Sequence, residues 1–224
     1  MPSPLSMPPP PRAFLFDLDG TLVDTAPDMA GALNRLRAEH DLPALPYATV
    51  RPWVSHGAGA LVKLGFGQDL PAEHMEALRL RYLDIYAARL YVESTLFPGM
   101  AEVLAALEAK GRAWGVVTNK PAFLTEPLLD GLGLRQRAGC IVSGDTLPQR
   151  KPDPAPVRHA CALLGLPEAT CVMVGDAERD IAAARAAGSP SIAAAFGYVL
   201  EDDDPHAWGA DAVVEHAGEL LAWI

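Results

Sequence analysis

The chain has 224 residues, half of them hydrophobic, and a formal net charge of −10. This length and apolar content predict a folded globular protein of one or two domains. The acidic excess argues against a broad surface for nucleic acid or for an anionic membrane, because both partners are themselves negatively charged. No apolar run approaches the roughly 20 residues that cross a bilayer.

The beginning of the chain does not have the pattern of a secretory signal. Its first eleven residues contain six prolines and no lysine or arginine, whereas a signal peptide needs a basic start followed by an apolar run. Residues 1–11 are therefore predicted to be a disordered leader. The cysteines Cys140, Cys161 and Cys171 form no C-x-x-C spacing, which favours buried, reduced thiols in a cytoplasmic protein.

The first strand-like run, residues 13–16, leads directly into Asp17-Leu18-Asp19-Gly20-Thr21. Reactive groups of open parallel α/β sheets lie at the carboxyl ends of strands. Asp17 and Asp19 alternate with Leu18, so both carboxylates can face one crevice. Gly20 allows a sharp turn that exposes backbone N–H groups to an anion. Burying two carboxylates together costs energy unless they share a cation or one is protonated; the alternative is a solvated acidic turn.

The next segment, between this strand and residue 95, contains no strand-like run. Its patterns predict helices near 26–40, 47–54, 57–64 and 71–91, and Thr25-Ala26-Pro27-Asp28 resembles a helix start with a hydroxyl cap. An interval of this length is too long for a loop. We therefore predict a helical cap domain over residues 25–94, inserted into a core formed by residues 12–24 and 95–224.

Strand-like and helical runs alternate from residue 101 to the end of the chain. This alternation predicts an α/β fold with a Rossmann-like, mostly parallel sheet covered by helices on both faces. The predicted strands lie near 113–117, 139–142, 170–174, 190–195 and 211–214, and the predicted helices near 99–110, 121–131, 154–164, 178–187 and 216–223.

Polar groups follow these later strands as well. Thr118-Asn119 follows an apolar run, Lys151 comes some residues after the next one, and Gly175-Asp176 with Asp180 follows a third. Parallel strands place their carboxyl ends on one edge of the sheet. A hydroxyl, an ammonium group and several carboxylates are therefore expected to converge there.

Taken in order, these four motifs resemble those of the haloacid-dehalogenase superfamily, and the match runs from Ala13 into the C-terminal region. The phosphoglycolate-phosphatase-like branch is the most similar. Residues 114–121 and 208–211 are also similar to bacterial N-acetylmuramic acid 6-phosphate phosphatases. The resemblance implies hydrolysis of a small-molecule phosphate monoester, with Mg²⁺ as cofactor, through an aspartyl-phosphate intermediate.

Phosphate-ester hydrolysis needs a nucleophile and a proton donor for the leaving alcohol. Asp17 suits the nucleophile, and Asp19 suits the general acid and base. The resemblance implies that Mg²⁺ is held by the Asp17 carboxylate, the Asp19 backbone carbonyl and Asp176. It also implies that Asp180 orients a metal-bound water, although Asp180 could equally be a helix-start acid that complements the helix dipole.

Positive charge and hydrogen-bond donors must surround the transferring phosphoryl group. Thr118 and Asn119 are expected to bind phosphate oxygens, Lys151 to neutralise them, and the backbone N–H groups of Leu18 and Gly20 to donate to them.

The residues that select the substrate are expected in the helical insert, which would close over the site and exclude water. Arg51, Ser55 and His56 are the polar candidates there, although Ser55 and His56 could serve only to begin the next helix. Lys120 is a candidate reader of a substrate carboxylate, and a surface lysine is the alternative.

Several related activities are compatible with parts of this pattern. A dehalogenase of this fold lacks a second acid like Asp19, a hexose-phosphate mutase shares all four motifs, and a phospho-acceptor signalling domain lacks the large insert. We therefore predict a Mg²⁺-dependent phosphatase, monomeric or homodimeric. Its expected substrate is 2-phosphoglycolate, yielding glycolate and phosphate, with N-acetylmuramic acid 6-phosphate or another sugar phosphate as the alternative.

Overall fold

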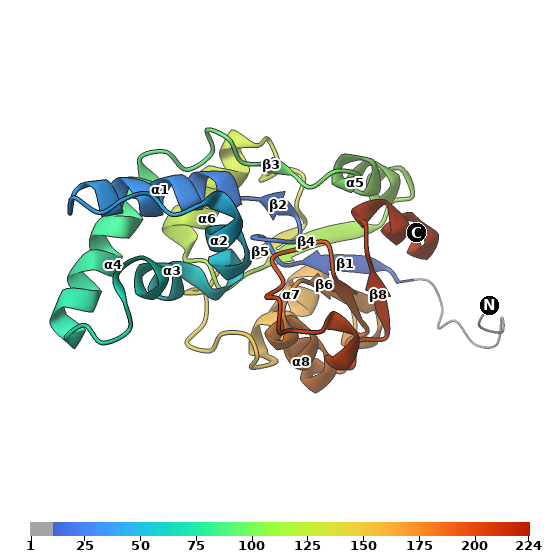
Figure 1. The fold of residues 1–224 in the computed structure, drawn as a ribbon. Helices are drawn as coiled ribbons and strands as arrows, with labels where there is room; N and C mark the ends of the chain where they lie inside the picture. The colour runs from blue at the N-terminus through green and yellow to red at the C-terminus, as the bar shows by residue number, and fades with distance from the viewer. Residues whose placement is uncertain (1–10) are drawn as a thin grey trace.

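A computed structural model describes residues 11–224, so nearly all of the predicted leader, residues 1–11, lies outside the described residues. The centre of the molecule is a six-stranded sheet in the order β5-β4-β1-β6-β7-β8 (Figure 1). Every neighbouring pair in this sheet is parallel, which confirms the predicted α/β class. Its strands are β1 (Ala13–Phe16), β4 (Ala113–Val117), β5 (Cys140–Val142), β6 (Cys171–Gly175), β7 (Ser191–Ala194) and β8 (Ala212–Val214).

Strand β1 lies in the middle of the sheet and is buried on both faces. Phe14 and Phe16 belong to one hydrophobic cluster, whereas Ala13 and Leu15 belong to another. This division follows from the alternation of side chains along a strand, and a strand without polar residues is typical of a parallel sheet covered on both sides. The chain extends outward from β1 in both directions, so the carboxyl end of β1 lies at a topological switch point, where ligands bind in such sheets.

Helices cover both faces of the sheet, as predicted. The cluster of Phe14 includes residues of α5, α6 and the C-terminal 3-10 helix η4, whereas the cluster of Leu15 includes residues of α7 and α8. The helix predicted over 216–223 is present, but it is a 3-10 helix and not an α-helix. The bounds are α5 (Met100–Ala109), α6 (Ala122–Gly131), α7 (Ala155–Leu164), α8 (Glu178–Ala187) and η4 (Ala217–Trp223), with short 3-10 turns η2 (Glu168–Thr170) and η3 (Pro205–Ala207).

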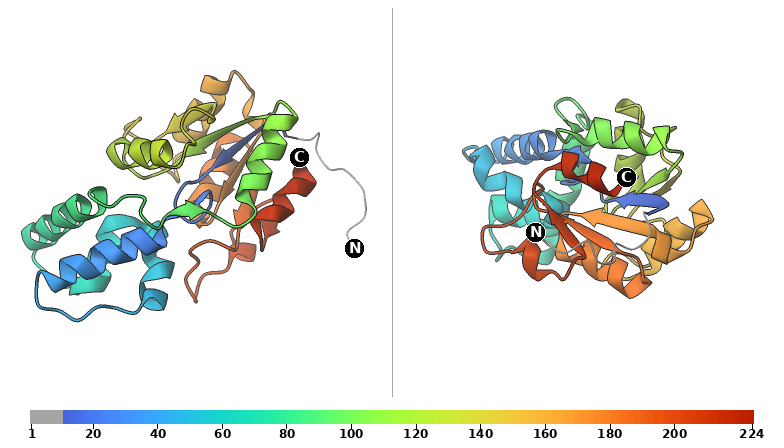
Figure 2. Two further views of the ribbon diagram at one scale, coloured as in Figure 1. Left: turned by 90° about the horizontal axis from the view of Figure 1, so that it is seen from above. Right: turned by 90° about the vertical axis from the view of Figure 1, so that its right-hand side faces the viewer.

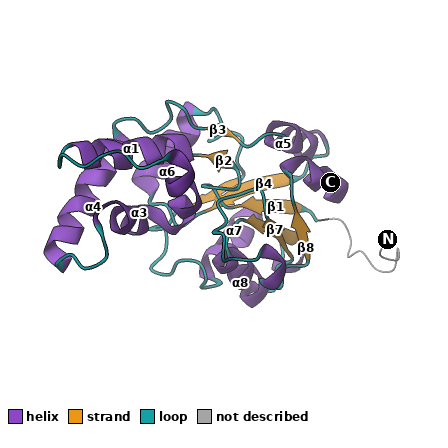
Figure 3. Ribbon diagram, viewed as in Figure 1, coloured by secondary structure: helices purple, strands orange, loops and turns teal. Residues whose placement is uncertain are grey.

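The segment between β1 and β4 is largely helical, and its helices gather at one side of the molecule (Figures 2 and 3). A short antiparallel pair, which the sequence did not predict, lies where the chain enters and leaves this segment. The elements are β2 (Val23–Asp24), α1 (Ala26–Ala38), α2 (Tyr47–Val50), the 3-10 helix η1 (Arg51–His56), α3 (Gly57–Phe66), α4 (Ala72–Ala87) and β3 (Thr95–Leu96).

The helix predicted over 47–54 is only partly correct, because the α-helix ends at Val50 and η1 follows. Pro52 lacks the N–H that an α-helix would require there, which explains the change. In α4, Leu78, Tyr82, Ile85 and Tyr86 are buried at helical spacing. The helical insert therefore has its own apolar packing, while its treatment as a separate domain over 25–94 stays a prediction.

No helix within residues 11–224 is both long enough and apolar enough to cross a bilayer.

Candidate active site

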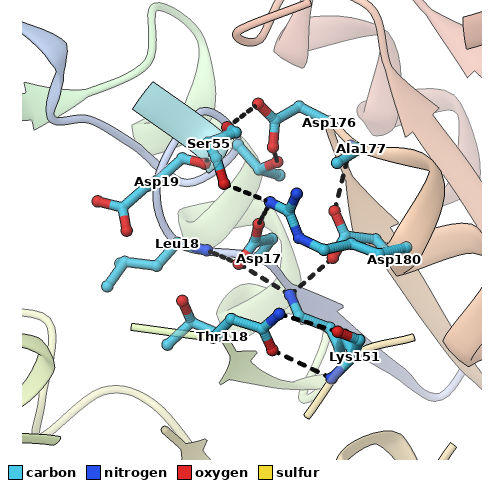
Figure 4. Close-up of polar contacts among 12 residues, drawn as sticks. Asp17, Leu18, Asp19, Ser55, Thr118, Lys151, Asp176, Ala177 and Asp180 are labelled. Atoms are coloured by element: carbon cyan, nitrogen blue, oxygen red, sulfur yellow. Dashed lines mark hydrogen bonds and ion pairs between the residues drawn. The ribbon is translucent and has the colours of Figure 1, made fainter. Parts of the chain in front are cut away.

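The polar groups that follow separate strands meet at one edge of the sheet, as the sequence predicted. Asp17 follows β1, Thr118 follows β4, and Asp176 follows β6. All three side chains are buried. Figure 4 shows Asp17, Thr118 and Lys151 on one side of the site, with Asp176 and Ser55 near Asp19 on the other. The predicted convergence at the carboxyl ends of the strands is therefore present in the folded chain.

The two carboxylate oxygens of Asp17 have different surroundings. Oδ1 lies 2.9 Å from Lys151 Nζ and accepts a 2.8 Å hydrogen bond from the Leu18 N–H. Oδ2 lies 3.9 Å from Arg179 Nη2, which is too far for a hydrogen bond. Oδ1 is thus fixed by the protein, whereas Oδ2 is less constrained.

The backbone N–H groups that we expected to bind phosphate are used within the protein. The Leu18 N–H donates to Asp17, and the Gly20 N–H donates to the Val23 carbonyl at 3.1 Å. Gly20 instead serves the close packing of the turn. It has φ +89°, and a Cβ at this position would lie 2.0 Å from Asp176 Oδ2, so the loop requires glycine.

Lys151 is fully enclosed between two acids. Its Nζ lies 2.9 Å from Asp17 Oδ1, 2.7 Å from Asp180 Oδ1 and 2.5 Å from the Val117 carbonyl. The Val117 carbonyl accepts a hydrogen bond, and the two carboxylates form ion pairs with the ammonium group. Burial alone would lower the pKa of Lys151, but the carboxylates of Asp17 and Asp180 raise it above its usual value. Lys151 therefore stays charged and holds the predicted nucleophile in place.

The second motif acts mainly on the Lys151 loop. The Asn119 side chain donates to the Lys151 carbonyl at 2.9 Å and accepts from the Lys151 N–H at 3.0 Å. This amide positions Lys151 with one of its two N–H donors, and the expected contact of Asn119 with phosphate stays a prediction. The Thr118 hydroxyl accepts a hydrogen bond from the Lys120 N–H at 3.1 Å. Because a hydroxyl also carries a donor, Thr118 remains suited to bind a phosphate oxygen.

Asp19 lies at the boundary between the sheet and the helical insert. Its Oδ1 is 2.8 Å from Lys120 Nζ and accepts a 2.6 Å hydrogen bond from the Thr25 hydroxyl. Thr25 thus holds Asp19 and does not cap a helix with its side chain. Lys120 also donates to the hydroxyl of Tyr86 in α4. Lys120 is buried, so the alternative of a surface lysine is wrong, while its contact with a substrate carboxylate stays a prediction.

Asp176 carries negative charge that the surrounding residues do not compensate fully. Burial, followed by the charges of Asp17 and Asp180, raises the pKa of Asp176 to about 7. Its hydrogen-bond donors are neutral: the Ser55 and Thr21 hydroxyls and the Tyr198 N–H. Carboxylate oxygens of Asp17, Asp176 and Asp180 lie within 4.8 Å of one another. Hard oxygen donors with excess charge suit a divalent cation such as Mg²⁺.

Asp180 has a different environment from Asp176. Its Oδ1 pairs with Lys151 at 2.7 Å, and its Oδ2 accepts a hydrogen bond from the Ala177 N–H at 3.2 Å. Burial raises the pKa of Asp180, although Lys151 opposes this shift. Within the described part of the chain, Asp180 Oδ1 accepts no hydrogen bond although it is buried beside Lys151, and one Asp180 oxygen belongs to the acidic cluster with Asp17 and Asp176. Asp180 thus supports Lys151 and begins α8, and its part in orienting a metal-bound water stays a prediction.

The three predicted cap residues, Arg51, Ser55 and His56, lie in η1, between the helical insert and the core. The Ser55 hydroxyl donates to Asp176 Oδ2 at 2.7 Å and lies 3.3 Å from the Asp19 carbonyl oxygen. Arg51 donates to the Gly197 carbonyl at 3.1 Å. His56 is exposed, although partial desolvation by its surroundings and then the charge of Arg179 lower its pKa. Ser55 therefore contacts the site, while Arg51 contacts the core loop that follows β7.

Sequence reasoning missed Arg179, which lies next to Asp180 in the fourth motif. Its Nη2 donates to the Ser55 carbonyl at 2.8 Å and faces Asp17 Oδ2. One signal was available, because a cation in the first turn of a helix is opposed by the helix dipole. An arginine at this position therefore suggests a purpose outside the helix.

The fold and site together define a parallel α/β hydrolase with an acidic centre. A family model of haloacid dehalogenase-like hydrolases matches residues 11–188. The chain belongs to this family, and it is a phosphatase, a phosphoric monoester hydrolase.

Curated relatives match nearly the full length. A phosphoglycolate phosphatase from Xanthomonas campestris pv. campestris is 48% identical, covering 95% of this chain and 97% of the relative. An N-acetylmuramic acid 6-phosphate phosphatase from Pseudomonas putida is 45% identical, covering 93% and 94%. A crystal structure of a predicted phosphoglycolate phosphatase from Haemophilus somnus superposes with a TM-score of 0.83 at 29% identity, covering 94% of this chain and 96% of that one.

Proposed function

We propose that this enzyme hydrolyses 2-phosphoglycolate, or a related small phosphate monoester, through an aspartyl-phosphate on Asp17. The supporting observation is the asymmetry of the Asp17 carboxylate. Lys151 and the Leu18 N–H fix Oδ1, while Oδ2 has no hydrogen bond among the described residues. An oriented carboxylate with one free oxygen suits nucleophilic attack.

In the proposed reaction, Asp17 Oδ2 attacks phosphorus as the bond from phosphorus to the ester oxygen breaks. Asp19 gives its proton to the departing oxygen, so that the alcohol leaves neutral. Asp19 then takes a proton from a water, whose oxygen attacks phosphorus. The bond from phosphorus to Oδ2 breaks, which releases inorganic phosphate and restores Asp17. Lys120 and Thr25 hold Asp19 Oδ1 during these steps, leaving Oδ2 to carry the proton.

The residues around Asp17 also suit a divalent cation, which we propose to be Mg²⁺. Asp17, Asp176 and the Asp19 carbonyl would hold it. When bound, it would supply positive charge to the phosphoryl oxygens. Thr118 would donate to the same oxygens, and the helical insert would exclude bulk water. Arg51, Ser55 and His56 are the proposed contacts for the remainder of the substrate.

N-acetylmuramic acid 6-phosphate is the second candidate substrate, because the Pseudomonas putida phosphatase named for that compound matches almost the whole chain.

We also propose a cytoplasmic location, supported by three buried free cysteines, and a monomeric or homodimeric state. Light scattering coupled to size-exclusion chromatography tests the oligomeric state.

The decisive assay measures phosphate release by the purified full chain with Mg²⁺, using both candidate substrates at matched concentrations. Asp17→Asn is the control, because it removes the nucleophile while keeping nearly the same shape. A ratio of kcat/KM values above about tenfold, equivalent to 1.4 kcal/mol, assigns the substrate. If the wild-type protein releases no more phosphate than Asp17→Asn from either compound, the proposed substrates are wrong.

A further inference from the structure

Arg179 connects the predicted nucleophile to the helical insert. It lies in the first turn of α8, and its side chain is 21% exposed. Its Nη2 is 2.8 Å from the Ser55 carbonyl oxygen in η1 and 3.9 Å from Asp17 Oδ2. The guanidinium therefore lies beside the oxygen that we propose to attack phosphorus, and a backbone atom of the insert fixes it there.

Most hydrogen-bond donors of Arg179 are unused. A guanidinium has five N–H donors in a rigid fork, and among the described residues it forms one hydrogen bond, to Ser55. The two lysines of the site differ in this respect. Lys151 Nζ is enclosed by one carbonyl and two carboxylate oxygens, and Lys120 is bound to Asp19 and Tyr86. Among these three cations of the described residues, Arg179 thus has the most donors left for a substrate.

The charge of the site supports the same conclusion. Within residues 11–224, the lysines that pair with the carboxylates of the site (Asp17, Asp19, Asp176 and Asp180) are Lys120 and Lys151. Without Arg179, the ionised side chains of the site would carry two uncompensated negative charges, so a divalent cation alone would only neutralise the site and would leave no net positive charge for a phosphate dianion. Burial alone would lower the pKa of Arg179, but the carboxylates, Asp180 and Asp17 first, raise it above its usual value. The guanidinium is therefore a permanent positive charge beside the nucleophile.

We infer that Arg179 is a substrate-binding residue whose free N–H groups donate to oxygens of the transferring phosphoryl group. This inference rests on the proposed function of Asp17. A planar fork matches two phosphate oxygens at once, and the Ser55 carbonyl holds the fork in position. Because every phosphate monoester presents the same phosphoryl group, Arg179 contributes equally to substrates with different alcohols.

Three variants test this role: Arg179→Met, Arg179→Lys and the control Arg158→Met. Arg158 is exposed and also donates to a single backbone carbonyl, that of Ala186, but it lies outside the site. Calorimetry with inorganic phosphate and Mg²⁺ measures binding without turnover. Steady-state kinetics then compare 2-phosphoglycolate with an aryl phosphate, and circular dichroism confirms the fold of each variant.

Arg179→Met should weaken phosphate binding and lower kcat/KM by about 10- to 150-fold, the effect of losing a hydrogen bond to a charged group. The loss should be the same for both substrates. Arg179→Lys, which keeps the charge without the fork, should fall between Arg179→Met and wild type, and Arg158→Met should stay within about twofold. If Arg179→Met does not fold, the lysine variant carries the test, with an expected loss of at least about threefold.

Two results would overturn the inference. Unchanged phosphate binding in folded Arg179→Met would exclude a contact with the phosphoryl group. A loss that depends strongly on the alcohol would mean that Arg179 only supports the insert through Ser55. A wild-type protein that binds phosphate without turning over the substrates would contradict the proposed function alone, since the binding comparison would still decide the role of Arg179.

Discussion

Replacing Lys151 by methionine should strongly destabilise the protein, independently of its effect on catalysis. The side chains of Lys151 and Asp180 are 0% exposed and that of Asp17 is 4% exposed. Removing one partner of a buried ion pair costs about 3–5 kcal/mol, because the remaining charge stays buried. For a chain of this size, 1 kcal/mol corresponds to roughly 2–4 °C. The midpoint of thermal unfolding should therefore fall by about 6–20 °C.

The size of this loss should depend on pH in a defined direction. Burial already raises the pKa of Asp180, and the charge of Lys151 opposes that shift. Because Lys151→Met removes this charge, it should raise the pKa of Asp180 further. A carboxyl group whose pKa is higher in the folded than in the unfolded state destabilises the fold as pH rises above the unfolded pKa of about 3.9. The deficit of Lys151→Met should thus be largest near pH 8 and smaller near pH 5, where the buried acids take up protons.

Thermal unfolding followed by circular dichroism in the presence of chelator measures this effect without metal. Lys63→Met is the matched control, because Lys63 is exposed and a surface substitution should change stability by no more than about 0.5 kcal/mol. Adding Asp180→Asn to Lys151→Met should restore part of the loss, since one buried charge is then removed. A decrease below about 2 °C in Lys151→Met, equal at both pH values, would refute the reasoning.

Three further predictions concern metal binding, the role of Asp19 and the roles of Asn119 and Thr118. Because burial and neighbouring carboxylates raise the pKa of Asp176 to about 7, Mg²⁺ must displace a proton below that pH. Its affinity measured by calorimetry should fall about tenfold per pH unit there, and a flat profile would contradict the assignment. Asp19→Asn should slow hydrolysis of an alkyl phosphate by about 10²–10⁴-fold and should slow hydrolysis of an aryl phosphate less. Acid quench should trap more aspartyl-phosphate in this variant than in wild type. Equal loss of rate for the two substrates would mean that Asp19 has only a structural role. Asn119→Ala should destabilise the fold by about 1–3 kcal/mol, because it leaves the backbone N–H and C=O of Lys151 unpaired. Thr118→Val should instead weaken inhibition by inorganic phosphate. Weaker phosphate inhibition in Asn119→Ala together with lower stability in Thr118→Val would exchange the roles of the two residues.

The parallel sheet and the meeting point of the motifs could be predicted from the sequence. Apolar runs such as residues 13–16 and 171–174 show no polar face, which is the pattern of strands buried on both sides. Once the strands are parallel, their carboxyl ends share one edge, so Asp17, Thr118 and Asp176 must lie near one another. This conclusion depends on strand direction alone and does not require any side-chain contact to be known.

The individual partners of these side chains could not be predicted in the same way. A short polar side chain in a loop can form hydrogen bonds with any of several nearby donors and acceptors. Which partner it binds is decided by the three-dimensional arrangement of the loop and its neighbours. Asn119 and Lys151 are 32 residues apart, yet the amide of one satisfies both backbone groups of the other. The Gly20 N–H, which the sequence suggested for phosphate, closes its own turn instead. The sequence thus indicates which residues belong to the site more reliably than what each one contacts.

The largest gap in the sequence reasoning concerns contacts between the helical insert and the catalytic carboxylates. The motifs assign chemistry to the core alone, because all four lie in it. In the folded chain, Ser55 of the insert donates to Asp176, and Tyr86 of the insert accepts from Lys120, the partner of Asp19. Both acids therefore depend on atoms of the insert for their surroundings. Since hydrogen bonds to a carboxylate favour its charged form, the position of the insert belongs to the acid–base chemistry of the site as well as to substrate selection.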